Sequence, residues 1–357
     1  MFPRAWSAVV PLAVLSVLLA GMTVVAALLG SPLVQHSMTE LLIMVVVVVG
    51  TYVFVGNSGV LSFGHISFMA IGAYASAWLT LPLALKRLNM PGLPEFLHEI
   101  SVPVTASALL SGMLAALVAL PVGVSILRLS GIGASIATLS VLVIVNVGYS
   151  NWDSVTLGTS SIVGLPSYTH LWTALVWALV ATAVAHAYQH SSHGLLLRAS
   201  RDNEVAAQAA GVNVFRERLL AWVISAFLVG IGGVLYAHFL GTISIDAFYL
   251  NLTFISLSML VVGGMASLTG AVIGVVTISL LIEALRQMEK SFEVAGLTLA
   301  LPPGSQEIGI AVTMLVILIL RPKGITNNRE VRWAIHTAGA ARASPVVPGA
   351  AKQGGRM

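Results

Sequence analysis

The sequence contains no cysteine, and charged residues make up only 8% of its 357 residues. The absence of cysteine excludes disulfides, thiolate chemistry and cysteine-based metal sites. A soluble domain carries about 25% charged residues, so this chain has too little charge to cover a surface that faces water. Hydrophobic residues make up 57% of the sequence, and the mean hydropathy is +0.96. These values indicate an integral membrane protein.

The motifs of nucleotide-binding and catalytic sites are also missing. No lysine follows a glycine, so the G-x-x-x-x-G-K-[ST] loop that binds nucleotide phosphates is absent. The sequence has no H-E-x-x-H motif and no pair of carboxylates at helical spacing within an apolar run. His190 and His193 are close in sequence, but the serines between them favour a solvated turn over a metal site. We therefore predict no catalytic, cofactor-binding or metal site.

Long apolar runs recur along the whole chain, and a helix needs about 20 residues to cross the hydrocarbon core. The alternating ten-residue segments of a membrane β-barrel are absent. We predict an all-α polytopic membrane protein with about ten transmembrane helices, nine being the alternative count. Residues 1–325 would form one transmembrane domain, and residues 326–357 a cytoplasmic, disordered tail. The candidate spans are 8–30, 40–56, 64–85, 104–127, 131–148, 170–188, 218–241, 250–264, 268–287 and 305–320.

Lysine and arginine predict the orientation of the chain. Most of them lie near the N-terminus, in the long loop 189–217, or after Leu320. Fewer lie in the loops of the opposite side, among them Lys86 and Arg286. Because cytoplasmic loops carry the excess of basic residues, we expect both termini in the cytoplasm. The tract 200–210 of the long loop is rich in helix formers and ends at Gly211, which predicts one short surface helix there.

The segment 57–77, NSGVLSFGHISFMAIGAYASA, brings polar groups into an apolar region. Non-helical backbone at membrane depth is tolerated only where protein or a cavity covers it. Asn57, Ser62, Gly64 and His65 therefore predict a helix break or part of a translocation pathway. Support of the break is the favoured role of His65, and contact with a transported solute remains the alternative.

A second glycine-rich interruption, VGGMASLTGAVIG at residues 262–274, echoes the first. Paired interrupted helices indicate a transport pathway between repeats, although shared glycine content could produce the same echo. Small residues allow close helix packing in membranes, which is the role we predict for Gly72, Gly230 and Gly233. Trp222 lies near a predicted span end, where tryptophan is typical of the membrane interface.

Several segments together resemble the permease subunits of branched-chain amino-acid ABC importers. Residues 197–237 match the R-A-x-R-x-x-E-x-A-A segment and the helix with G-x-x-G-x-L-Y-A that follows it. Residues 59–74 match G-x-L-S-x-G-H-x-x-F-x-x-x-G-A-Y, and residues 321–325 match R-P-x-G-[IL]. Residues 127–140 and 151–166 match more loosely, since Ser130 and Ala134 stand where arginine and an aromatic residue are common. The resemblance covers residues 40–325 and favours the M-type (LivM-like) subunit over its H-type (LivH-like) partner.

The resemblance implies a role for the loop 189–217. In such importers a helix of this loop docks into a cleft of an ATPase and couples ATP hydrolysis to transport. On this basis we expect Glu204, Ala207 and Gly211 to be central to coupling, with Arg201 and Asn213 in support. A positive-inside anchor would explain the arginines but not the alanine-rich tract that ends at Gly211.

The resemblance also implies an assembly in the bacterial inner membrane. The partners would be a second, LivH-like permease subunit, two cytoplasmic ABC ATPases that bind ATP and Mg²⁺, and an external solute-binding protein. This chain would have no cofactor and no enzymatic activity. The cargo would be branched-chain amino acids or a related small polar solute such as urea, amides or aromatic acids. The alternative is a self-sufficient secondary carrier or channel for a small solute.

Overall fold

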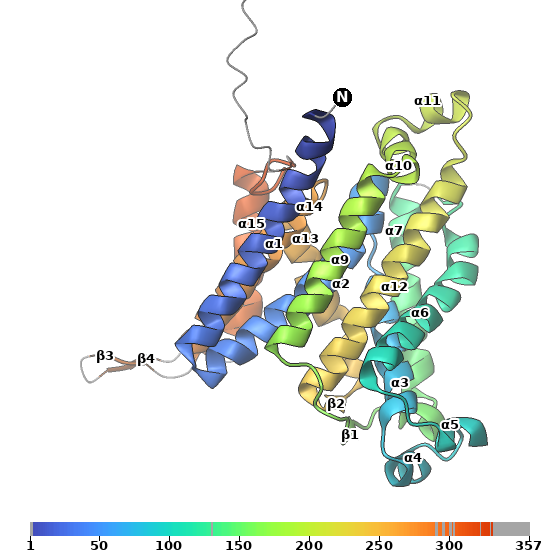
Figure 1. Ribbon diagram of the computed structural model, residues 1–357, viewed down its shortest axis with the longest axis vertical. Coiled ribbons are helices and arrows are strands. Elements are labelled where there is room, and N and C mark those ends of the chain that lie inside the picture. The colour runs from blue at the N-terminus through green and yellow to red at the C-terminus, as the bar shows by residue number, and fades with distance from the viewer. Residues whose placement is uncertain are drawn as a thin grey trace, which may run out of the picture.

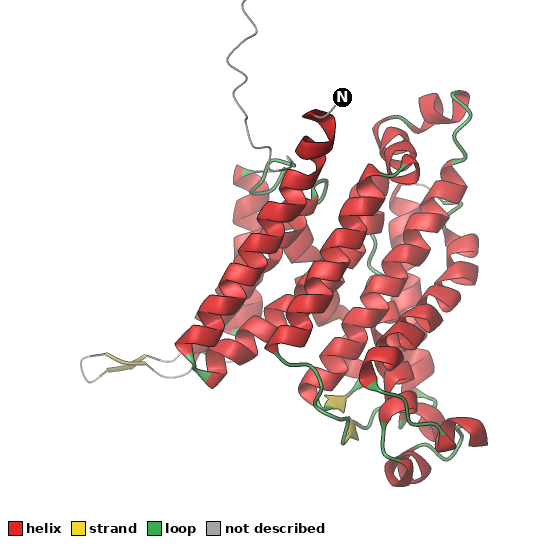
Figure 2. Ribbon diagram, in the orientation of Figure 1, coloured by secondary structure: helices red, strands yellow, loops and turns green. Residues whose placement is uncertain are grey.

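The computed structural model describes residues 3–129, 131–289, 292–294, 297–299, 302, 304–321, 323–328 and 330, and it is almost entirely helical (Figures 1 and 2). The long helices are α1 (Pro3–Leu29), α2 (Pro32–Ser58), α3 (His65–Thr80), α6 (Val104–Ile126), α7 (Gly131–Ser150), α9 (Leu171–His190), α12 (Val214–Leu240), α13 (Leu250–Gly263), α14 (Leu268–Glu289) and α15 (Ser305–Leu320). Shorter helices are α4 (Leu83–Asn89), α5 (Glu95–Glu99), α8 (Asp153–Thr156), α10 (Ser192–Asp202), α11 (Glu204–Ala209) and the 3₁₀ helix η1 (Ile245–Phe248). Two antiparallel strand pairs complete the described chain: β1 (Ile162–Val163) with β2 (Thr242–Ile243), and β3 (Phe292–Val294) with β4 (Leu297–Leu299).

The all-α polytopic membrane fold is confirmed. Within the described residues, 8 helices are long and apolar enough to cross a membrane. The two remaining spans of the predicted ten, α3 and α15, have 16 residues each. Helix α3 is shorter than a full span because it begins only after the interruption that follows α2.

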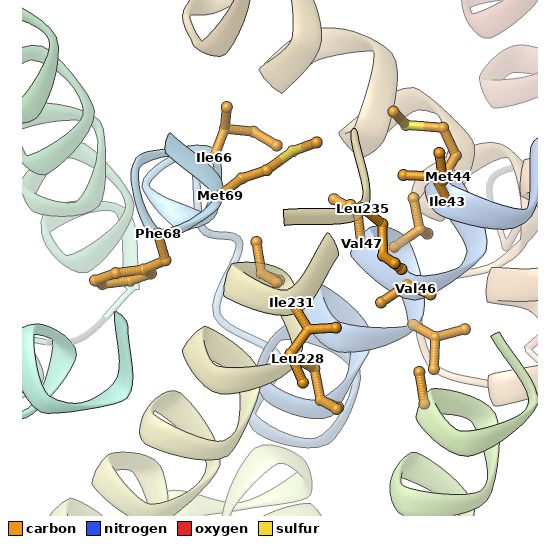
Figure 3. Packing of buried hydrophobic residues seen from close by; sticks show 14 of the residues in the cluster. Ile43, Met44, Val46, Val47, Ile66, Phe68, Met69, Leu228, Ile231 and Leu235 are labelled. Carbon is orange, nitrogen blue, oxygen red and sulfur yellow. The ribbon is translucent and has the colours of Figure 1, made fainter. Parts of the chain in front are cut away.

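Helix α2 forms the centre of the bundle. Its apolar run, LLIMVVVVVG, is buried on all sides, as expected of a helix that is hydrophobic around its whole circumference. In Figure 3, Val46 and Val47 of α2 lie near Leu228 and Ile231 of α12. Helices α6 and α7 instead expose large apolar side chains such as Leu117, which is the pattern of helices that face lipid.

The crossing of α3 and α12 depends on glycine. A Cβ atom at Gly72 would lie 2.1 Å from the carbonyl oxygen of Gly230, and one at Gly233 would lie 1.9 Å from that of Met69. Neither position has room for a side chain, so the two backbones are in direct contact. The glycines predicted to pack helices therefore lie where the backbones of α3 and α12 touch.

The two ends of the bundle differ in structure. Helices α10 and α11 and the start of α1 lie at one end, called here the α10–α11 end (Figure 1). Helices α4 and α5 and the β1–β2 pair lie at the other, the α4–α5 end. Lys86 of α4 is fully buried there, and its ammonium donates to the carbonyl oxygens of Leu97 at 3.2 Å and Ile100 at 2.6 Å. These two bonds hold the α4–α5 segment together. Burial also lowers the pKa of Lys86, so this lysine is not a solvated loop charge.

Candidate functional site

The first interruption of the bundle joins α2 to α3. Gly59 closes α2 in the left-handed conformation (φ 73°), and its N–H donates to the carbonyl of Val55. Helix α7 completes the hydrogen bonds of the opened backbone. The Ser135 hydroxyl donates to the carbonyl of Leu61 at 2.7 Å, and the amide of Phe63 donates to the Thr138 hydroxyl at 3.1 Å. Two α7 hydroxyls thus replace helical partners, as membrane depth requires.

The polar residues of this interruption support the backbone and each other. Asn57 is fully buried and donates from Nδ2 to the carbonyl of Val53. His65 Nδ1 lies 2.7 Å from Ser62 Oγ, and the amide of Gly64 donates to the same hydroxyl. Among the described residues, Asn57 Oδ1 and His65 Nε2 find no hydrogen-bond partner. The interruption is therefore present at the predicted residues, and the hydroxyl of Ser62 holds His65 in place.

Aromatic rings enclose His65. Its ring centroid lies 4.8 Å from that of Trp222, 5.7 Å from that of Phe54 and 6.3 Å from that of Phe68. Trp222 is completely buried and donates its indole N–H to the carbonyl of Ala119. The prediction of an interfacial position for Trp222 was wrong, because α12 begins eight residues before it and carries it into the core. These contacts favour support of the bundle over solute contact as the role of His65.

The second interruption joins α13 to α14 and lies at the same end of the bundle as the first. Gly264 adopts φ 118°, and a Cβ atom at Gly263 would lie 1.9 Å from the carbonyl oxygen of Gly270. The segment after α15 binds this interruption. Thr326 donates from its amide and its hydroxyl to the carbonyl of Gly263, at 3.1 and 2.8 Å. The Glu330 carboxylate accepts the amide N–H of Leu268 at 2.7 Å, so it caps the N-terminus of α14.

The predicted boundary of the tail requires a correction. Residue 326 was expected to begin a disordered tail, yet Thr326, Asn328 and Glu330 all bind the second interruption. The physical reason is that the α13–α14 break leaves backbone groups without helical partners. Asn328 and Glu330 accept from the free N–H groups, and Thr326 donates to the free carbonyl of Gly263. The rest of the predicted tail, 331–357, lies outside the described residues.

The two interruptions meet. A Cβ atom at Gly56, near the end of α2, would lie 2.8 Å from the carbonyl oxygen of Met265 in the second interruption. Helix α10 reaches the same point, because Arg201 Nη1 donates to the carbonyl oxygen of Gly56 at 2.7 Å. The arginine side chain also covers Gly59, where a Cβ atom would lie 2.5 Å from Arg201 Cγ. Arg201 thus connects the loop that follows α9 to the first interruption, at the point where that interruption meets the second.

The loop contains two helices where one was expected. Asn203 has extended backbone (φ −155°) that ends α10, and its side chain accepts from the amide of Ala206 to start α11. The single predicted helix 200–210 was therefore wrong, because asparagine competes with the helical backbone and favours a cap. Gly211 (φ 86°) follows α11 where a stop was predicted, and Asn213 caps α12 by accepting from the amide of Arg216.

The predicted coupling residues do not all face outward. Glu204 binds Arg218 of α12 through contacts of 2.9 and 3.4 Å, and Ala207 is buried. The exposed residues of α11 are Val205, Ala206, Gln208 and Ala209. The sequence reasoning missed these residues, although a valine and alanines on one side of a charged helix could have indicated them. The loop therefore has two distinct parts: the exposed face of α11, and the side chains that connect α11 to the bundle.

Comparison with known proteins places the chain in a family. The family described as "Branched-chain amino acid transport system / permease component" matches residues 33–320. The chain belongs to this family. It is 24% identical over 321 residues to the "High-affinity branched-chain amino acid transport system permease protein LivM" of Escherichia coli K12, which covers 80% of this chain and 68% of that protein. LivM of Salmonella typhimurium LT2 matches with the same identity and coverage.

An H-type protein also matches, over a shorter region. The "Probable branched-chain amino acid transport permease protein LivH" of Methanocaldococcus jannaschii is 27% identical over 136 residues, 37% of this chain and 40% of that protein. No solved structure matches the chain. The resemblance drawn from the sequence blocks is therefore confirmed at the level of the permease family.

Proposed function

We propose that this chain is the transmembrane permease subunit of an ATP-binding-cassette importer in the bacterial inner membrane, with both termini in the cytoplasm. It translocates branched-chain amino acids, driven by two partner ATPases that bind ATP and Mg²⁺. A second, LivH-like permease subunit and an external solute-binding protein complete the assembly. The family and the names of the LivM relatives support this cargo. The longer match to LivM than to LivH supports the M-type role.

The observation that carries the proposal is the form of α11. This helix of 6 residues projects from the α10–α11 end, and apart from Gln208 the side chains it leaves exposed are small or aliphatic. Val205, the largest of them, is 78% exposed. An exposed apolar face on a charged loop is typical of a surface that a partner covers. Small residues allow that partner to approach the helix backbone closely, which suits docking of α11 into a cleft of an ATPase.

The contacts of the loop define a route for the coupled motion. Movement of α11 would pull on α12 through the Glu204–Arg218 ion pair. Movement of α10 would pull on the end of α2 through the bond from Arg201 to the carbonyl of Gly56. Because the first interruption contacts the second at Met265, α13 and α14 would move with α2. The bundle would then alternate between outward and inward openings, with no covalent chemistry in this chain.

A substitution on the exposed face tests this route. In proteoliposomes that contain the complete transporter, Ala206→Trp should abolish ATP-dependent leucine uptake and leave the chain folded, because Ala206 is exposed. Ala206→Ser, which keeps a small side chain at the same position, is the matched control and should transport normally. Normal uptake by Ala206→Trp would overturn the coupling role of α11. Transport by the isolated chain, driven by a voltage or pH gradient, would instead support a secondary carrier or channel.

The cargo is tested separately. Uptake of leucine, urea and an aromatic acid by the same proteoliposomes should show leucine as the preferred solute. Import of urea or an aromatic acid without leucine would overturn the branched-chain assignment and leave the ABC-importer role intact.

A further inference from the structure

A charged cavity lies within the bundle, toward the α4–α5 end. Its volume is about 260 Å³, and its walls come from α2, α12, η1, α13, α14 and the start of α15. The cavity contains Glu40 of α2, Asp246 of η1, and Glu283 and Arg286 of α14. Ionisable groups inside a membrane bundle are costly and mark solute or ion pathways. None of the residues of the two interruptions contributes to its walls.

The arginine of the cavity is shared between two carboxylates. Arg286 Nη1 lies 3.5 Å from Glu40 Oε2 and 3.5 Å from Glu283 Oε2. Both distances exceed the 2.7–2.9 Å of a strong charge-assisted hydrogen bond by about 0.6 Å. Each of the three side chains remains partly exposed, between 24% and 32%. The guanidinium is therefore positioned in the cavity without a tight partner among the described residues.

The two glutamates are held differently. Glu283 accepts from the Ser37 hydroxyl at 2.9 Å and from Gln287 Nε2 at 2.6 Å, so protein donors fix its position. The carboxylate of Glu40 has only the long contact with Arg286 among the described residues. With Asp246, the cavity has three carboxylates against one guanidinium. The cavity therefore has more carboxylates than cationic side chains.

The remaining walls combine polar side chains, such as Asn251, with apolar ones. Met44 of α2, Ile255 and Met259 of α13, and Ile282 of α14 all line the cavity. Its volume is below the roughly 300–1,000 Å³ of pockets for drug-sized ligands. A guanidinium, carboxylates in excess of it and apolar side chains line the same cavity. They suit a small molecule that carries a positive charge, a negative charge and an aliphatic group.

We propose that this cavity is a solute-binding site on the translocation route, and that its ligand is a zwitterionic aliphatic amino acid. Arg286 binds the carboxylate of the solute, Glu40 and Asp246 bind its ammonium group, and Met44 and Ile255 contact its side chain. The identity of the ligand rests on the proposed function, and the position of the site rests on the cavity. Glu283 positions Arg286 and is itself held by Ser37.

The natural absence of cysteine allows a direct test. A single cysteine in the cavity, Ser279→Cys, changes only oxygen to sulfur at a lining residue. Val163→Cys, in exposed β1 at the same end of the bundle, is the matched control outside the cavity. In the complete transporter, leucine should slow the reaction of Ser279→Cys with a thiol reagent and leave the rate of Val163→Cys unchanged. Leucinamide, which lacks the carboxylate, should protect Ser279→Cys only at concentrations about tenfold higher or more, since hydrogen bonds to charged groups contribute strongly.

Adding Arg286→Gln to the Ser279→Cys variant tests whether Arg286 binds the solute or only supports the structure. We expect this variant to remove the preference for leucine over leucinamide, whereas a purely structural arginine would leave the preference intact. Arg286→Lys, which retains the charge, should restore part of it. Equal reaction rates of Ser279→Cys with and without leucine, in a transporter that imports leucine, would overturn the site while the proposed function stands. A complete transporter without leucine uptake would contradict the proposed function, and protection by leucine would then still support the cavity.

Discussion

Replacing Gly233 with alanine should force α3 away from α12. The added Cβ atom would lie 1.9 Å from the carbonyl oxygen of Met69, whereas ordinary van der Waals contact begins at 3.4 Å. Accommodating it requires a displacement of about 1.5 Å between two backbones, since no flexible side chain can move aside. Overpacking of this kind costs about 1–3 kcal/mol.

Gly148 provides the matched control. It lies in α7, and a Cβ atom there meets nothing within 4 Å. Gly148→Ala should stabilise the chain by about 1 kcal/mol, because alanine is the better helix former. The two variants should therefore differ by about 2–4 kcal/mol in the free energy of unfolding.

Thermal unfolding of the purified chain in detergent measures this difference. We expect Gly233→Ala to unfold at a lower temperature than the wild type, and Gly148→Ala at the same or a higher temperature. Equal midpoints for the two alanine variants would refute the direct backbone contact of α3 and α12.

Three further substitutions test other contacts. Glu330→Ala should lower the free energy of unfolding by about 1–2 kcal/mol through loss of the cap on α14. Glu307→Ala, at the exposed start of α15, should leave it nearly unchanged. Equal effects of the two variants in a denaturation series would contradict the cap. Lys86→Met should lower the free energy of unfolding by about 1–3 kcal/mol, because two buried carbonyls lose their donor. Limited proteolysis should cut the α4–α5 segment faster in this variant than in the control Arg87→Met, whose arginine is exposed. Arg201→Ala should lower the ratio of leucine imported to ATP hydrolysed in proteoliposomes, and Arg216→Ala, an exposed neighbour, should not; an unchanged ratio in Arg201→Ala would remove Arg201 from the coupling route.

The membrane class and the main spans were predictable because they depend on local composition. The apolar run of α2 and the interruption after it are visible in the sequence, since glycine and hydroxyl residues interrupt hydrophobic periodicity at Gly59 and Ser62. The stop at Gly211 was likewise predictable, because glycine readily adopts the positive φ that ends a helix.

Contacts between distant residues were not predictable in the same way. Nothing local distinguishes Lys86, which is buried, from its exposed neighbour Arg87. Glu204 could have faced an ATPase as expected, but its ion pair with Arg218 depends on how α11 folds back onto α12. The capping of α14 by Glu330 joins residues 62 positions apart. One sequence taken alone carries no signal for such pairs of distant residues.

The binding of Thr326, Asn328 and Glu330 to the α13–α14 interruption has a consequence for biosynthesis. Helix α14 starts at Leu268, but its cap is translated only after α15 and the turn that follows it. During translation Ser267 can already accept from the amide of Gly270, but the amide of Leu268 must remain without the Glu330 carboxylate until α15 has been made. A nascent chain cut before Glu330 would contain all the helices of the described residues and still lack the carboxylate that accepts from the first amide of α14.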